Sequence, residues 1–118
     1  MDEPTRGIQA DVAPSGDGCV ECLDGSGPGW WLHLRRCAEC GHIGCCDNSP
    51  SQHASLHNQQ TDHPITQSFE TGEEWFYDYV EQAFFNGPRL APPTSHPQSQ
   101  PIPGPADNVP ADWRNQLN

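Results

Sequence analysis

The chain has 118 residues, a net charge of −11 and a hydrophobic content of 33%, diluted by 11 glycines and 13 prolines. A chain of this size and composition forms one domain with a thin core, so we expect a metal or disulfides to stabilise it. The five basic residues are all arginines, and so acidic a chain is poorly suited to nucleic-acid backbones or anionic membrane surfaces.

The first 17 residues are polar and show no apolar periodicity, which predicts a flexible lead over 1–17. The acidic start at residues 1–4 is not followed by an apolar run, so we expect no secretory signal. No later segment is long enough to span a membrane. We therefore expect a cytoplasmic location, where cysteines more often bind a metal than form disulfides.

The first predicted strand covers residues 30–35, where apolar positions alternate. Adjacent strand residues point to opposite faces, so only one of Trp30 and Trp31 can face the core. The other is then available for a binding surface. A short second strand is predicted over 42–45, after the turn at Cys40-Gly41.

A helix is predicted over 51–60 because residues 48–51 form a helix-start signal and Pro64 ends the segment. Residues 65–69 alternate as a strand does. A second helix is predicted over 73–86, where apolar residues recur at helical spacing behind an acidic first turn. The sum is a small zinc-stapled α+β domain over residues 18–86, with a short antiparallel sheet and two helices.

The last segment, residues 87–118, differs in composition from the domain. Eight prolines lie between residues 88 and 110, among Ser, Gln and Ala. Such a stretch has little apolar surface to offset its ordering entropy, so we expect a disordered tail. Trp113 either docks on the domain or is exposed.

The cysteines and histidines form the clearest chemical pattern. Two Cys-x-x-Cys pairs can each supply one edge of a tetrahedral zinc site. The candidate ligands are Cys19, Cys22, Cys37, Cys40, Cys45, Cys46, His53, His57 and His63. Because a closed structural site takes four ligands, two zinc ions fit with one cysteine over, and a single ion is the alternative.

His53 and His57 are four residues apart and project from one face of the predicted helix. They either chelate one ion together or reach two ions that lie side by side. The spacing alone leaves both arrangements open.

The ordered spacing of these residues over about 17–85 resembles the ubiquitin-protease-type (UBP) zinc finger, in its short stand-alone bacterial form. The matching residues are Cys19, Cys22, Trp31, Cys37, Cys40, Gly41, Cys45, His53, Ala54, His57, His63, Pro64, Trp75 and Tyr77. The resemblance implies that one zinc is bound by Cys19, Cys22, Cys45 and His53. A second is then bound by Cys37, Cys40, His57 and His63.

Cys46 remains outside both sets implied by the resemblance. It has three interpretations: a packed thiol, a zinc ligand in place of another cysteine, and a redox-sensitive thiol beside a zinc thiolate.

Eukaryotic relatives bind the free C-terminal Gly-Gly of ubiquitin in a pocket of aromatics and an arginine. The resemblance places Trp31, Trp75 and Tyr77 at or near the aromatic positions, and Asp47 where those relatives have the arginine. Because aspartate repels a carboxylate, we expect weak or no binding of ubiquitin's tail. Arg35 or Arg36 could substitute only by facing the same pocket, and Trp75 and Tyr77 could instead be core residues.

Both implied sites are closed by four protein ligands, which leaves no zinc-bound water to activate, so we expect no enzymatic activity. The expected function is a monomeric module that binds a peptide or protein tail through an aromatic pocket. Two alternatives are a redox- or zinc-responsive regulator that uses Cys45 and Cys46, and an accessory protein whose acidic surface contacts a basic partner.

Overall fold

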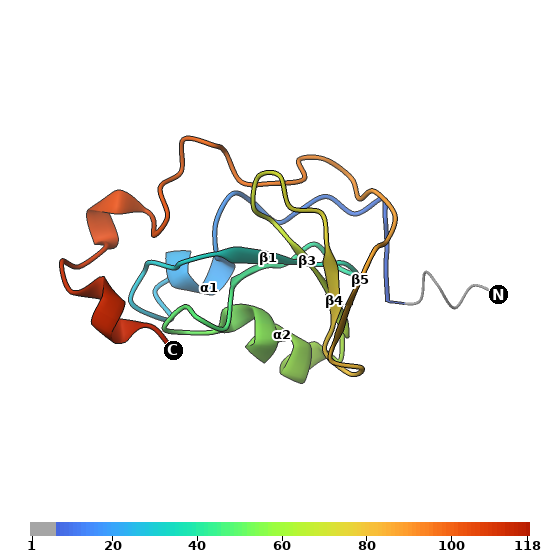
Figure 1. The fold of residues 1–118 in the computed structure, drawn as a ribbon, viewed down its shortest axis with the longest axis horizontal. Coiled ribbons are helices and arrows are strands. Elements are labelled where there is room, and N and C mark those ends of the chain that lie inside the picture. The colour runs from blue at the N-terminus through green and yellow to red at the C-terminus, as the bar shows by residue number, and fades with distance from the viewer. Residues whose placement is uncertain (1–6) are drawn as a thin grey trace.

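A five-stranded antiparallel sheet is the frame of the protein in the computed structural model, which describes residues 7–118 (Figure 1). The strand order is β2-β1-β3-β4-β5. The strands are β1 (Leu34–Cys37), β2 (Ile43–Cys45), β3 (Ile65–Ser68), β4 (Phe76–Asp78) and β5 (Ala83–Phe85). The first six residues of the predicted flexible lead lie outside the described part of the chain.

Strand β1 pairs with a neighbour on both sides. Arg35 lies opposite Gly44 of β2 and Ser68 of β3. Because β1 and β3 are inside the sheet, nearly all of their residues are buried. The strands predicted over 30–35, 42–45 and 65–69 are thus present, although the first begins only at Leu34.

Helix α2 (His53–Thr61) packs against β2 and β1. It begins after Gln52 and ends at Asp62, and both flanking residues adopt the left-handed conformation, with φ of 55° and 61°. The close approach of helix and sheet depends on Gly44, since a Cβ there would lie 2.7 Å from the backbone nitrogen of Ala54. The predicted helix over 51–60 is therefore confirmed, and β2 holds its first turn in place.

The helix predicted over 73–86 is wrong, because this segment forms the hairpin β4–β5. Pairing of β4 with β3 buries Phe76, and the carboxylate of Asp78 accepts the N–H groups of Val80 and Glu81 in the turn. Val80, one of the apolar residues in the segment predicted as a helix, is 73% exposed. The α+β class is confirmed, with the short helix α1 (Val20–Leu23) as the second helix.

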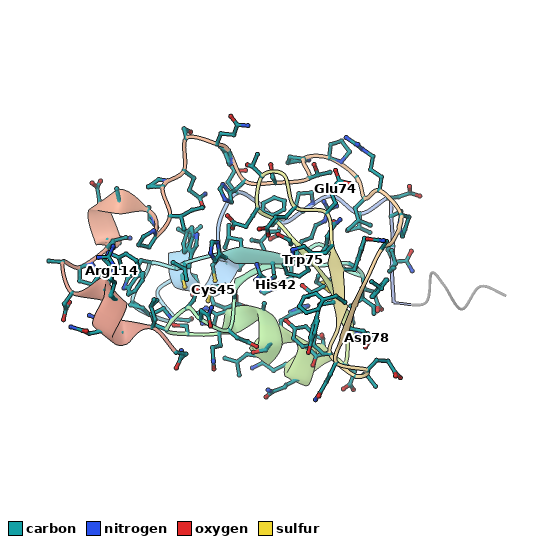
Figure 2. The ribbon with its side chains drawn as sticks, viewed as in Figure 1. His42, Cys45, Glu74, Trp75, Asp78 and Arg114 are labelled. Atoms are coloured by element: carbon teal, nitrogen blue, oxygen red, sulfur yellow. The ribbon has the colours of Figure 1, made fainter. Side chains whose placement is uncertain are left out.

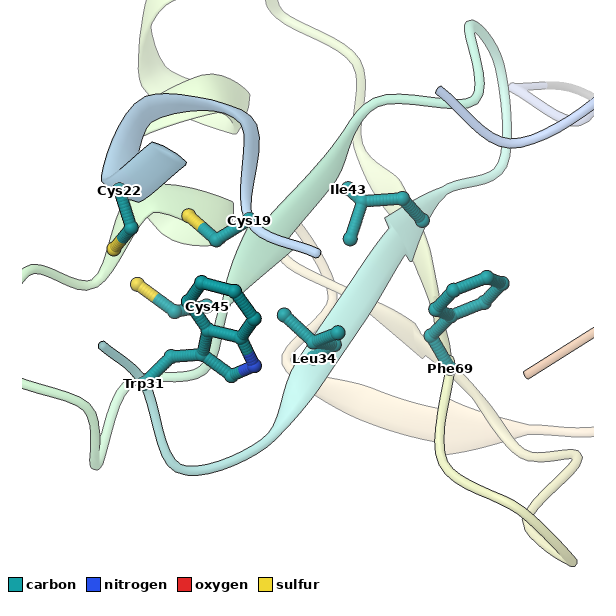
Figure 3. Packing of buried hydrophobic residues seen from close by; sticks show 7 residues of the cluster. All are labelled: Cys19, Cys22, Trp31, Leu34, Ile43, Cys45 and Phe69. Atoms are coloured by element: carbon teal, nitrogen blue, oxygen red, sulfur yellow. The ribbon is translucent and has the colours of Figure 1, made fainter. Parts of the chain in front are cut away.

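Two clusters of buried side chains make up the core. One joins three cysteines to apolar residues of the sheet, as Figure 3 shows for Cys19, Cys22, Trp31, Leu34, Ile43, Cys45 and Phe69. The other lies towards β3 and β4 and contains Ile8, Ala38, Ile65, Phe76 and Leu90. Trp30 and Trp31 are both buried, so neither is available as an exposed aromatic residue.

Residues 87–118 return along the side of the sheet away from α2 and end in two short 3-10 helices, η2 (Ala106–Asn108) and η3 (Trp113–Gln116) (Figure 1). Trp31 and Gly104 exchange backbone hydrogen bonds of 2.9 and 3.1 Å. Trp113 is half-buried, and its ring is covered by Arg114. The disorder predicted for 87–118 stays a prediction, which these contacts make testable.

Within residues 7–118, no helix has the length and apolar character needed to cross a membrane.

Candidate metal centres and the adjoining groove

The first metal centre lies between α1, β2 and the start of α2. Its ligand atoms, from Cys19, Cys22, Cys45 and His53, lie within 4.8 Å of one another, and all four residues are buried. Nδ1 of His53 is 3.2 Å from the sulfur of Cys19, 3.4 Å from that of Cys22 and 3.5 Å from that of Cys45. Figure 3 shows the three sulfurs gathered at one end of the buried cluster.

The second centre uses the end of β1, the middle of α2 and the segment before β3. Its ligand atoms, from Cys37, Cys40, His57 and His63, also lie within 4.8 Å of one another. Sγ of Cys37 is 3.4 Å from Nδ1 of His63, and Sγ of Cys40 is 3.3 Å from Nε2 of His57. His53 and His57 therefore serve two different centres, which settles the question that their spacing left open.

These distances fit zinc. With Zn–S bonds near 2.3 Å and Zn–N bonds near 2.0–2.1 Å, a tetrahedral site has S···N edges of about 3.6 Å. The donor sets, Cys₃His and Cys₂His₂, are those of closed structural zinc sites. Both predicted ligand sets are brought together, and the prediction of two zinc ions is confirmed by the fit.

The three thiols of the first centre affect one another's protonation. Hydrogen bonds to Cys19 and Cys45, together with burial, raise the pKa of the Cys22 thiol, whereas hydrogen bonds from the same group of thiols lower the pKa of Cys45 to about 2. Three buried neighbouring thiols thus favour a single thiolate on their own. A divalent cation stabilises all three as thiolates, which is the form that binds metal.

The two centres differ in exposure. All ligands of the first are buried, whereas in the second Cys40 is exposed and the two histidines are half-buried. Beside the second centre the His42 ring stacks on His57 at 4.0 Å, and Nε2 of His42 is 2.8 Å from the carboxylate of Glu21. His42 is not among the nine candidate ligands named from the sequence, and nothing in the local sequence indicated its contact with α1.

Cys46 belongs to neither centre. It is buried, with its sulfur 3.4 Å from Oγ of Ser49, and it lies along the groove described next. This placement agrees with the interpretation of Cys46 as a packed thiol.

An open groove of about 480 Å³ lies between the β4–β5 hairpin, β1 and the loop that follows β2. Its walls include Arg35, Asp47, Trp75, Tyr77 and Phe84. The ring of Phe84 is 5.1 Å from that of Trp75 and 4.8 Å from that of Tyr77, between centroids. The hairpin pairs Phe84 with Tyr77, so this aromatic wall is a direct result of the turn at 79–82. Figure 2 shows Trp75 at the entry to β4.

Three of the four residues predicted to bind a peptide, Asp47, Trp75 and Tyr77, line this one groove. Trp31 does not, because it is 2% exposed and packs beside the first metal centre. Tyr79 and Phe84 were missed as lining residues, since the prediction of a helix placed them on different faces of that helix.

Of the two neighbouring arginines, Arg35 faces the groove, and its guanidinium carbon is 4.7 Å from the centroid of the Trp75 ring. Arg36 is 1% exposed and donates hydrogen bonds to the carbonyls of Val12 and Pro93. Because neighbouring residues of a strand point to opposite faces, Arg35 is directed to the groove and Arg36 to the interior.

The groove and the second metal centre are adjacent. Arg35, Thr66 and Tyr79 line both the groove and the small recess formed by Cys37, His57 and His63. The ligands of the second centre therefore support one wall of the groove.

Comparison with known proteins agrees with this site. A family model described as the zinc finger of ubiquitin hydrolases and other proteins matches residues 19–90. The chain is also similar to a solved structure, the solution NMR structure of RPA1320 from Rhodopseudomonas palustris. The two are 41% identical with a TM-score of 0.63, over 87% of this chain and 94% of that one.

Proposed function

Because the chain belongs to the family of zinc fingers found in ubiquitin hydrolases and other proteins, we propose that it is a protein-interaction module that binds a peptide or protein tail in the aromatic groove. The two zinc ions stabilise the fold, as structural zinc does in small domains. The proposal includes no catalytic step, because each centre has four protein ligands.

The observation that carries the proposal is the pairing of Arg35 with Trp75 in an open groove. Aromatic side chains are favoured in binding surfaces, and a guanidinium held over an aromatic ring can still donate its free N–H groups to a carboxylate. Among residues 7–118, one nitrogen of Arg35 is occupied by a protein acceptor, the carbonyl of Leu34, and the others are not. Arg35 can thus provide the cation that the sequence lacks at Asp47.

Asp47 is the reason that we do not propose free ubiquitin as the ligand. It is exposed in the same groove and repels a carboxylate placed near it. A tail that binds must direct its anionic end to Arg35 and away from Asp47.

The remaining parts of the proposal concern what does not bind. A net charge of −11 opposes the binding of nucleic acid and of anionic membranes. We further propose that the protein is a cytoplasmic monomer.

The alternative function as a redox-responsive regulator is less favoured, since Cys46 is 4% exposed and has Ser49 as its neighbour. Sensor cysteines are accessible.

The test is an NMR titration of the zinc-loaded protein with a neutral hexapeptide that has a free carboxyl end, and with its amidated counterpart. We expect shifts at the Trp75 indole and at Arg35, and at least tenfold weaker binding of the amide. Arg35→Gln should remove that difference, whereas Arg114→Gln, which changes an exposed arginine stacked on Trp113, should leave it unchanged. If no peptide moves the groove resonances, the proposed function is wrong.

A further inference from the structure

Asp47 has no charge partner within the described residues 7–118, although it lies in a groove that contains an arginine. The ion pairs of this part of the chain do not include Asp47, and no hydrogen bond is made to its carboxylate. Arg35 is instead directed to the face of Trp75 and the carbonyl of Leu34. The groove therefore presents a positive group and a negative group that do not neutralise each other.

Tyr79 shows that both charges act on the same space. Burial raises the pKa of its phenol, the nearby carboxylate of Asp47 raises it further, and Arg35 acts in the opposite direction. The hydroxyl group of Tyr79 therefore experiences both charges at once. A ligand that fills the groove contacts a surface that is anionic towards Asp47 and cationic towards Arg35.

We infer that the tail recognised by the groove carries a lysine or arginine side chain that pairs with Asp47, while its carboxyl end is directed to Arg35. This inference rests on the proposed function. The residues beside Asp47 suit a basic side chain, because Asn48 and Ser55 add polar groups to this part of the groove without adding a positive charge. The ligand class is therefore a basic tail.

The charge of the whole chain favours the same class. A protein with a net charge of −11 attracts cationic segments and repels acidic ones at long range. Asp47 adds a local penalty for acidic tails, since like charges in one groove repel each other. The groove then selects basic tails by attracting them and by repelling acidic ones.

The test uses acetylated hexapeptides with free carboxyl ends, in which one lysine is moved through the four positions before the last residue. Norleucine at the same positions keeps the aliphatic stem and removes the charge, and glutamate reverses it. For the zinc-loaded protein at low salt, we expect one lysine peptide to bind at least fivefold more tightly than its norleucine match. The glutamate peptide should bind most weakly.

Asp47→Asn should abolish the preference for lysine and leave the affinity for the norleucine peptide within about twofold. The matched control is Asp107→Asn, which changes the net charge equally at an exposed residue of η2 outside the groove. Equal binding of lysine and norleucine peptides, with binding still lost in Trp75→Ala, would overturn this inference and leave the proposed function standing. No binding of any peptide would overturn both.

Discussion

Nε2 of His96 donates a 2.8 Å hydrogen bond to the carboxylate of Glu70, although the two residues are 26 positions apart, and their side chains are 3% and 6% exposed. The backbone N–H of His96 also donates to the carbonyl of Phe69. The same carboxylate accepts the N–H of Leu34 at the start of β1. One buried glutamate thus links the proline-rich tail to β1.

The first prediction concerns this link. Glu70→Gln should lower the free energy of unfolding by about 1.5–3 kcal/mol, because it removes a charged acceptor of buried hydrogen bonds. It should also speed hydrogen exchange at the amides of Trp31 and Gly104, whose mutual bonds depend on a docked tail. Glu81→Gln, at an exposed turn residue, is the control. Exchange at unfolded-chain rates throughout 87–118 of the unmodified protein would instead support the predicted disorder.

The second prediction is the pH dependence of the same contact. Burial alone would raise the pKa of Glu70, but hydrogen bonds from His33, His96 and the Leu34 N–H outweigh it and lower that pKa from 4.5 to about 2. A carboxyl group with a lowered pKa stabilises the fold above its unfolded pKa and loses that contribution as the pH falls through its folded pKa. The contribution of the Glu70 carboxylate to the difference in stability between the unmodified protein and Glu70→Gln should therefore be fully present at pH 5. It should shrink between about pH 4.5 and 2.

That comparison requires excess zinc in every buffer, because acid also protonates metal ligands. A difference that stayed unchanged down to pH 3 would show that the Glu70 carboxylate contributes no charge-dependent stability.

The third prediction follows from the unequal exposure of the two metal centres. A chelator should remove zinc from the second centre first, because Cys40 is exposed while every ligand of the first centre is buried. Cys40→Ser should retain one zinc ion and the core around Cys45. Cys45→Ser should abolish cooperative folding, since the first centre is part of the core. Native mass spectrometry would measure the number of bound zinc ions, and circular dichroism would measure folding. Simultaneous loss of both ions from Cys40→Ser would contradict the prediction.

The fourth prediction concerns the contact of α2 with the sheet. Gly44→Ala should cost about 1–3 kcal/mol of stability, as overpacking does, because the new methyl group would lie 2.7 Å from a backbone nitrogen of α2. Displacement of α2 moves His53 and His57 together, so both zinc ions should be bound less tightly. Gly16→Ala is the control, since nothing lies within 4 Å of its Cβ position. Thermal unfolding and zinc titration would measure the two effects.

The metal centres could be predicted from sequence because their signals are local. A Cys-x-x-Cys turn and two histidines four apart fix donor geometry over a few residues. The hairpin at 76–85 could not be predicted in this way, because its apolar spacing also suits a helix. The choice is made by pairing between Gln67 and Phe76, which the local sequence does not encode.

The groove shows the same limit. Alternation along a strand indicates that Arg35 and Arg36 face opposite ways, but not which of them faces the hairpin. That depends on the position of β1 between β2 and β3, and on the Trp75 ring that covers Arg35. The buried position of Trp31 likewise depends on residue 104, far along the chain.

The ligands of the two metal centres overlap along the chain, since the first set runs from Cys19 to His53 and the second from Cys37 to His63. During synthesis the first centre cannot close before His53 emerges, and by then both cysteines of the second are already exposed to the same metal. Until His63 follows, five ligand cysteines and two ligand histidines compete for zinc without a fixed pairing. The short helix α2 resolves this competition, because forming it directs His53 and His57 to separate ions in a single step.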